Sequence, residues 1–133
     1  MIKKIHHVGI VVSNLNDALA LYEKMLGVKA ARIETVPEQG VKAALLPLKD
    51  GGEIELLEPI DPQSGIGKFL ERKGEGIHHV TFEVDNVENE IKSMAAKGVE
   101  MIDKQSRMGL AGRIAFVHPK STRGVLIELA QKV

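Results

Sequence analysis

An internal repeat limits what this chain can fold into. The tetrapeptide Ile5-His6-His7-Val8 returns 72 residues later as Ile77-His78-His79-Val80. The tripeptide Ile-Glu-Leu also occurs twice, with its glutamate at Glu55 and again at Glu128. Each half of the chain therefore carries one His-His motif followed by one Ile-Glu-Leu motif. Repetition of this kind indicates two structural modules of the same type.

The composition is that of an ordinary globular protein. The chain has 133 residues, of which 44% are hydrophobic, and its 18 basic residues balance its 18 acidic ones. Balanced charge without a basic run argues against a nucleic acid or a membrane as partner. The chain contains no cysteine, which excludes a disulfide framework and a thiolate nucleophile. No apolar stretch approaches the ~20 residues of a membrane span. We therefore expect a cytoplasmic protein, or one inside an organelle if a leader has been removed.

Both halves predict the order strand, helix and three strands. In the first half, apolar residues at a 3.6-residue period predict a helix between Asn14 and Gly27. In the second half, the same pattern predicts a helix between Asn86 and Gly98. The strands of the first half are expected at 2–12, 29–36, 40–48 and 53–58. Those of the second half are expected at 77–84, 99–103, 113–117 and 124–130, with loops at 106–112 and 118–123.

The predicted elements define an α+β fold of two tandem βαβββ modules. We expect one domain over 1–133, with module one at about 1–59, a connector at 60–76 and module two at 77–133. A short helix is expected in the connector at 66–73. A single helix covers only one face of each module's sheet. The uncovered faces should therefore pack against each other or curl around a shared cleft.

The repeated histidines and glutamates are candidate metal ligands. Side chains alternate across a strand, so His7 shares a face with Gly9, and His79 shares one with Thr81. A single strand histidine or glutamate is more often structural, but matched positions in both modules favour a shared site. If a pseudo-twofold axis relates the modules, both histidines and both glutamates converge. Two imidazoles and two carboxylates suit Zn, Ni, Co, Mn or Fe and leave open positions for catalysis. The expected ligands are His7, Glu55, His79 and Glu128.

The remaining histidines have other expected roles. His6 and His78 point away from the proposed ligands, and we interpret them as packing groups or as groups that support the ligands. His118 precedes Pro119 in a loop and is expected to be structural or close to a substrate.

These motifs resemble the vicinal oxygen chelate superfamily, and within it the methylmalonyl-CoA epimerases most of all. The resemblance covers essentially the whole chain, and it is most specific at 5–10, 37–41, 74–80, 118–120 and 124–129. Glyoxalase I shares the ligand set, but its last module usually reads Asp-Pro-Asp-Gly before Ile-Glu-Leu. Here the corresponding segment is His118-Pro119-Lys120 with a longer loop.

The resemblance implies a curved mixed sheet around a central metal cleft, with the same four ligands. It implies one divalent ion, Co²⁺ first and Zn²⁺, Mn²⁺ or Ni²⁺ otherwise, together with an acyl-CoA substrate and a homodimer. The implied reaction interconverts (R)- and (S)-methylmalonyl-CoA by removing and returning the C2 proton. The metal would stabilise the enolate, and a carboxylate on each face of C2 would act as acid and base.

One position departs from the family pattern. Several epimerases carry a glutamate on the strand after Glu-Gln-Gly, where this chain has Ala43, and often have glutamine at the metal position held here by Glu55. We expect Glu128 to be one acid/base group and Glu55 the other, with a water or a lysine as the alternative for the second. Lys120 is expected to meet an anionic part of the substrate or to be solvated.

Three other functions fit parts of the pattern. Glyoxalase I acting on a glutathione hemithioacetal is the nearest alternative. A metal-free small-molecule binding module is less favoured because it needs no set of four matched ligands. An extradiol dioxygenase would use two histidines and one carboxylate, and Glu55 as a fourth ligand argues against it.

Overall fold

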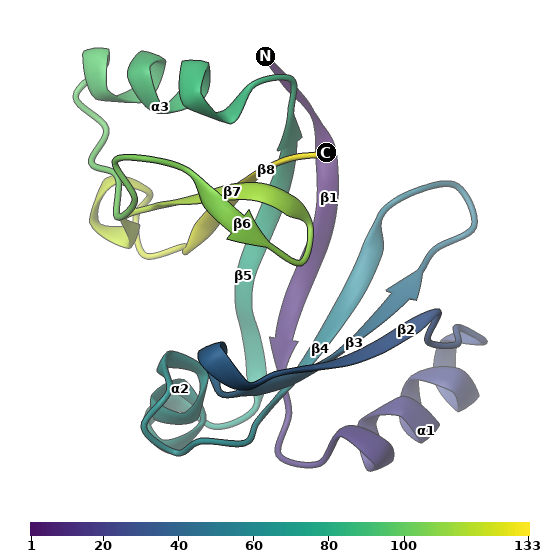
Figure 1. Ribbon diagram of the computed structural model, residues 1–133. Coiled ribbons are helices and arrows are strands. Elements are labelled where there is room, and N and C mark those ends of the chain that lie inside the picture. Colours follow the sequence, from purple (N-terminus) through teal and green to yellow (C-terminus); the bar gives the residue numbers. More distant parts are fainter. The chain divides into compact units, whose positions relative to one another are not determined.

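The computed structural model describes residues 1–133 and contains both predicted modules. Module one contains β1 (Ile2–Val11), α1 (Leu15–Leu26), β2 (Arg32–Val36), the 3-10 helix η1 (Pro37–Gln39), β3 (Val41–Pro47) and β4 (Glu53–Pro59). The connector contains α2 (Gly65–Lys73). Module two contains β5 (Gly76–Val84), α3 (Val87–Ala96), β6 (Arg107–Gly109), β7 (Gly112–Val117), the 3-10 helix η2 (Pro119–Ser121) and β8 (Ile127–Gln131) (Figure 1). The predicted α+β class with two βαβββ modules is confirmed. None of the helices is long and apolar enough to cross a membrane.

The chain forms two compact units, and β1 and β5 each contribute to both. The N-terminal unit comprises His7–His78, and the C-terminal unit comprises Met1–His6 together with His79–Val133. The strand order is β2-β3-β4-β1 in the N-terminal unit and β5-β8-β7-β6 in the C-terminal unit. In both units the sheet is mixed, because β1 pairs with β4 and β5 pairs with β8 in parallel, whereas the other pairs are antiparallel.

Helix α1 covers one face of the N-terminal sheet. Its first turn is capped by Asn14, whose side chain accepts a hydrogen bond from the backbone N–H of Asp17, and it ends at Gly27 in the left-handed conformation. Both limits agree with the prediction. Its buried residues Leu15 and Ala18 belong to a core cluster that is completed by Val12, Ala44, Leu46 and Leu56. The apolar core of this unit therefore lies between α1 and one face of the sheet, and the opposite face of the sheet is not part of this core.

Helix α3 has the same role in the C-terminal unit. Asn86 caps it by accepting a hydrogen bond from the backbone N–H of Asn89. The last helical residue is Ala96 and the C-cap is Lys97, one residue before the predicted stop at Gly98. Its apolar side contributes to a core cluster of Val84, Val87, Ile91, Met101, Ala115, Val117 and Leu129. Each module thus has one helix, α1 or α3, on one face of its sheet, as predicted.

The strand predicted at 99–103 is wrong, and so is the loop predicted at 106–112. Only Met101 forms an isolated bridge, with Val117, and the second strand of module two is β6, inside the predicted loop. The carboxylate of Asp103 accepts the backbone N–H of Phe116. A side chain thus takes the donor that a continuing strand ladder would use, and regular pairing resumes only at Arg107.

A stability test follows from the turn at the start of β7. Gly112 has φ +116°, and a Cβ there would lie 2.2 Å from the carbonyl oxygen of Gln131. Gly98 also has a positive φ, +81°, but nothing lies within 4 Å of its Cβ position. We expect Gly98→Ala to lower the free energy of unfolding by about 1–2 kcal/mol from backbone strain alone. Gly112→Ala should cost about 3 kcal/mol or more because the clash adds to that strain. Urea denaturation measures both, and equal losses would contradict this view of the turn.

Candidate metal centre

The N-terminal unit places a histidine and a glutamate together on the face opposite α1. Along β1, His7, Gly9 and Val11 are buried and alternate with half-buried residues. Gly9 pairs with Glu55 in the parallel register of β1 and β4, so His7 and Glu55 are diagonal neighbours on one face. Nε2 of His7 lies 3.5 Å from Oε1 of Glu55. The two residues are only 2% and 5% exposed.

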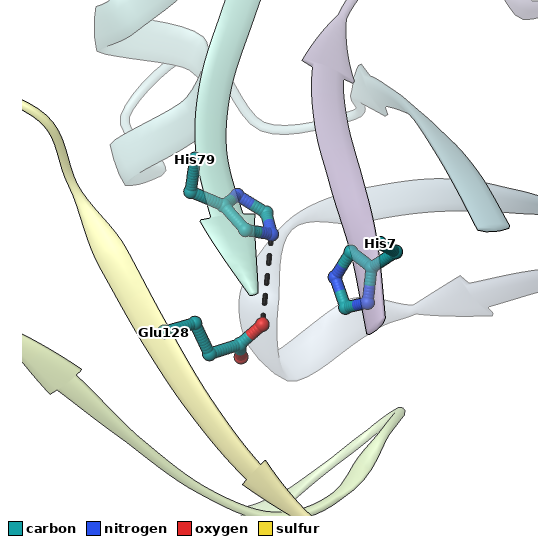
Figure 2. A group of neighbouring side chains, drawn as sticks. All are labelled: His7, His79 and Glu128. Atoms are coloured by element: carbon teal, nitrogen blue, oxygen red, sulfur yellow. Dashed lines mark ion pairs between the residues drawn. The ribbon is translucent and has the colours of Figure 1, made fainter. Parts of the chain in front are cut away.

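The C-terminal unit repeats this arrangement on the face opposite α3. Thr81 pairs with Glu128 in the parallel register of β5 and β8, which makes His79 the diagonal neighbour of Glu128. Nε2 of His79 lies 3.6 Å from Oε1 of Glu128, and Figure 2 shows the two side chains turned toward each other from their strands. Both residues are buried. The same register therefore produces a buried His–Glu pair in each module.

The separation within each pair suits two ligands of a metal ion. Two atoms that are each about 2.0–2.2 Å from a shared ion lie on the order of 3.0–3.5 Å apart. The observed 3.5 and 3.6 Å are close to this spacing and longer than an ordinary hydrogen bond. Within each unit the buried imidazole and carboxylate can each offer one ligand atom to a metal ion. Nitrogen and carboxylate oxygen are a donor set of divalent transition metals.

Two residues that the sequence did not single out support the pair in the C-terminal unit. The buried hydroxyl of Thr81 donates a hydrogen bond of 2.5 Å to Oε1 of Glu128. The ring of Phe116 meets the imidazole of His79 edge to face, with 6.0 Å between the ring centres. Alternation places Thr81 on the face of His79, but its contact with Glu128 depends on the β5–β8 register. In the N-terminal unit the position equivalent to Thr81 is Gly9, which has no hydroxyl.

The other residues considered in the sequence take different positions. Lys120 is exposed in η2, and its backbone N–H donates to Nδ1 of His118 at 3.0 Å. His118 thus caps η2, which fits a structural role. The ring of His78 lies edge to face against Phe69, with 5.0 Å between centres, in agreement with the packing role expected for it.

Comparison with known proteins agrees with the fold and the site. Residues 6–117 match the family model described as "Glyoxalase/Bleomycin resistance protein/Dioxygenase superfamily". The chain therefore belongs to this superfamily, which is the vicinal oxygen chelate superfamily expected from the sequence.

Within the superfamily, the similar proteins include methylmalonyl-CoA epimerases. A mitochondrial one from Dictyostelium discoideum is 36% identical over 98% of this chain and 80% of its own length. The crystal structure of the Mycobacterium tuberculosis epimerase is 34% identical, covers 99% of this chain and 89% of its own, and has a TM-score of 0.94. An epimerase solved in complex with methylmalonyl-CoA and NH₄⁺ is 35% identical over 100% of this chain and 96% of its own, with a TM-score of 0.92. The resemblance to the methylmalonyl-CoA epimerase family is confirmed.

The hydrogen bond from Thr81 can be tested by removing only its hydroxyl. Thr81→Val keeps the side-chain shape but takes a buried donor from the Glu128 carboxylate. We expect a loss of about 1–3 kcal/mol in the free energy of unfolding, measured by denaturation in the presence of a chelator. Thr81→Ser, which retains the donor, should lose less. The exposed Thr35→Val on β2 is the control, and a loss no larger in Thr81→Val than in this control would contradict the assignment.

Proposed function

We propose that this protein is a methylmalonyl-CoA epimerase, which interconverts the (R) and (S) substrate by moving the proton at C2. The observation that carries the proposal is the buried His–Glu pair that both modules build in the same strand register. Epimerisation at a carbon next to a thioester needs stabilisation of negative charge on the thioester oxygen and proton transfer on both faces of C2. A duplicated pair of imidazole and carboxylate offers groups for both requirements.

We further propose that His7, Glu55, His79 and Glu128 hold one divalent ion, with Co²⁺ favoured and Zn²⁺, Mn²⁺ or Ni²⁺ as alternatives. The ligand spacing within each pair and the nitrogen–oxygen donor set support this. When bound, such an ion supplies a Lewis acid that favours negative charge on the thioester oxygen.

In this proposal the two glutamates move the proton. Glu128 serves one face of C2 and Glu55 the other, each as base and then as acid. Oε1 of Glu128 accepts the hydrogen bond from Thr81 and faces Nε2 of His79. Burial of both carboxylates excludes water, which favours return of the proton to carbon.

The remaining parts of the proposal rest on the family. Lys120, exposed in η2, would meet an anionic part of the acyl-CoA. The two modules would form one domain over 1–133, the chains would pair as a homodimer, and the protein would act in the cytoplasm. Glyoxalase I is not favoured, because the epimerases described above match nearly the whole chain.

Removal of the metal tests the reaction. Purified protein stripped with a chelator should lose deuterium uptake at C2 of methylmalonyl-CoA, because charge on the thioester oxygen is no longer stabilised. Reconstitution with Co²⁺ should restore uptake, as followed by NMR. Turnover of the methylglyoxal–glutathione adduct, assayed in parallel, should stay at background. Uptake that is indifferent to chelation, or none with metal bound, would reject the epimerase.

The role of Glu128 is tested by a neutral isostere. Glu128→Gln cannot accept the C2 proton, so we expect turnover to fall by about 100-fold or more. The melting temperature should change much less, because the amide retains the shape and one oxygen. Glu100→Gln, which changes an exposed glutamate of the same unit, is the control for charge. Parallel losses of turnover and stability in Glu128→Gln would indicate a structural residue instead.

A further inference from the structure

Arg107 lies on the same sheet face as His79 and Glu128. In the β6–β7 register Arg107 pairs with Ile114, and in the β7–β8 register Phe116 pairs with Glu128. Paired residues point to the same side of a sheet, and Ile114 and Phe116 are two residues apart on one strand. The side chains of Arg107, Phe116 and Glu128 therefore share the face opposite α3. The sequence prediction placed Arg107 in a loop and gave it no function.

Phe116 connects Arg107 with His79. The guanidinium carbon of Arg107 lies 5.5 Å from the centre of the Phe116 ring, within the range of a cation–π contact. The same ring meets the imidazole of His79 edge to face. The guanidinium is thus separated from the imidazole of a candidate metal ligand by one aromatic ring.

The position of Arg107 is fixed by the residues around it. Oδ1 of Asp103 accepts the Nε–H of Arg107 at 3.2 Å, and Oδ2 of the same carboxylate accepts the backbone N–H of Phe116 at 2.7 Å. The Asp103 carboxylate therefore links the side chain of Arg107 to β7, the strand that carries Phe116. The side chain of Asp103 is only 16% exposed, which limits its movement.

The residue before Arg107 is fixed as well. Ser106 donates its backbone N–H to Glu88 at 2.7 Å. Hydrogen bonds from Ser106 lower the pKa of the Glu88 carboxyl. Arg113 donates to the hydroxyl of Ser106 at 2.9 Å and to its carbonyl at 3.1 Å. The backbone that carries Arg107 is therefore held on α3 and β7, although β6 has only three residues.

The terminal amino groups of Arg107 remain available. The only hydrogen bond of its side chain is the one from Nε to Asp103, and this side chain is 47% exposed. Arg32 provides the comparison, since it lies on β2, the edge strand in the N-terminal unit. Its Nη2 is 2.7 Å from Oε1 of Glu34, so that terminal nitrogen is already engaged by protein. A guanidinium held at Nε with both Nη groups open is prepared for an oxyanion, which it binds through two parallel hydrogen bonds.

We propose that Arg107 is a substrate-recognition residue that binds an oxyanion of the acyl-CoA through Nη1 and Nη2. This inference rests on the proposed function and adds a specificity residue to it. The oxyanion is either the free carboxylate of the acyl group or a phosphate of the CoA. Both present oxygens that fit the guanidinium fork, and they can be separated by ligands that lack one or the other.

Calorimetry with three unreactive or achiral ligands tests the proposal on the metal-loaded protein. The ligands are malonyl-CoA, propionyl-CoA, which lacks the carboxylate, and malonyl-pantetheine, which lacks the phosphates. We expect Arg107→Gln to weaken malonyl-CoA binding about 10- to 100-fold, the effect of one charge-assisted hydrogen-bonded contact. Arg107→Lys should recover only part of this loss, because an ammonium group cannot form the two parallel bonds.

The two other ligands identify the oxyanion. If Arg107 binds the carboxylate, Arg107→Gln weakens malonyl-pantetheine but leaves propionyl-CoA unchanged. If it binds a phosphate, propionyl-CoA is weakened and malonyl-pantetheine is unchanged. A purely structural role would weaken all three ligands alike, and that result would overturn the proposal.

Arg32→Gln removes the same charge from the N-terminal unit and is the matched control, with an expected change of less than twofold. Equal effects of Arg32→Gln and Arg107→Gln, or unchanged affinity in Arg107→Gln, would also overturn the proposal. Either result would be compatible with normal deuterium uptake at C2 by the wild-type protein, so the proposed function would stand. Loss of the proposed function itself would instead be seen as no uptake by the wild-type protein.

Discussion

The parallel pairing of the first and last strands within each module is the constraint on which the site depends. Gly9 pairs with Glu55 in one module, and Thr81 pairs with Glu128 in the other. Because side chains alternate across strands, this register places each histidine diagonally beside a glutamate of the neighbouring strand. A slip of one residue would move the glutamate to the helix-covered face, where apolar side chains form the core. The hydrophobic pattern that packs α1 and α3 therefore also aligns the polar pairs.

Burial of these polar pairs is costly unless each group has partners. A buried carboxylate without compensation is strongly destabilising, and an imidazole beside it offsets only part of that cost. Thr81 contributes a further hydrogen bond to Glu128. The chain buries such a pair at two places, on sheet faces where apolar residues would stabilise the fold more. Retaining a destabilising polar pair is typical of a functional site and not of a hydrophobic core.

Much of this could be predicted from the sequence, because the information is local or periodic. Asn14 and Gly27 mark the ends of α1 by their capping chemistry, and the repeat equates His7 with His79 by position alone. The position of β6 could not be predicted in this way. Residues 99–103 have the apolar character of a strand, but Asp103 uses its side chain to bind the backbone of Phe116. The contacts of Phe116 with Arg107 and His79 depend on two successive strand registers, which periodicity does not reveal.

The two compact units do not follow the boundary of the repeat. Met1–His6, at the start of module one, belongs to the compact unit of module two, where the backbone N–H of Asp85 donates to the carbonyl of Met1 and Lys3 forms an ion pair with Glu83. If module two were separated from module one at the connector, it would lack the segment Met1–His6 that packs with it. An ancestor with a single copy would thus have needed a second molecule to lend it those residues. Gene fusion would have converted that exchange between molecules into a permanent link within one chain.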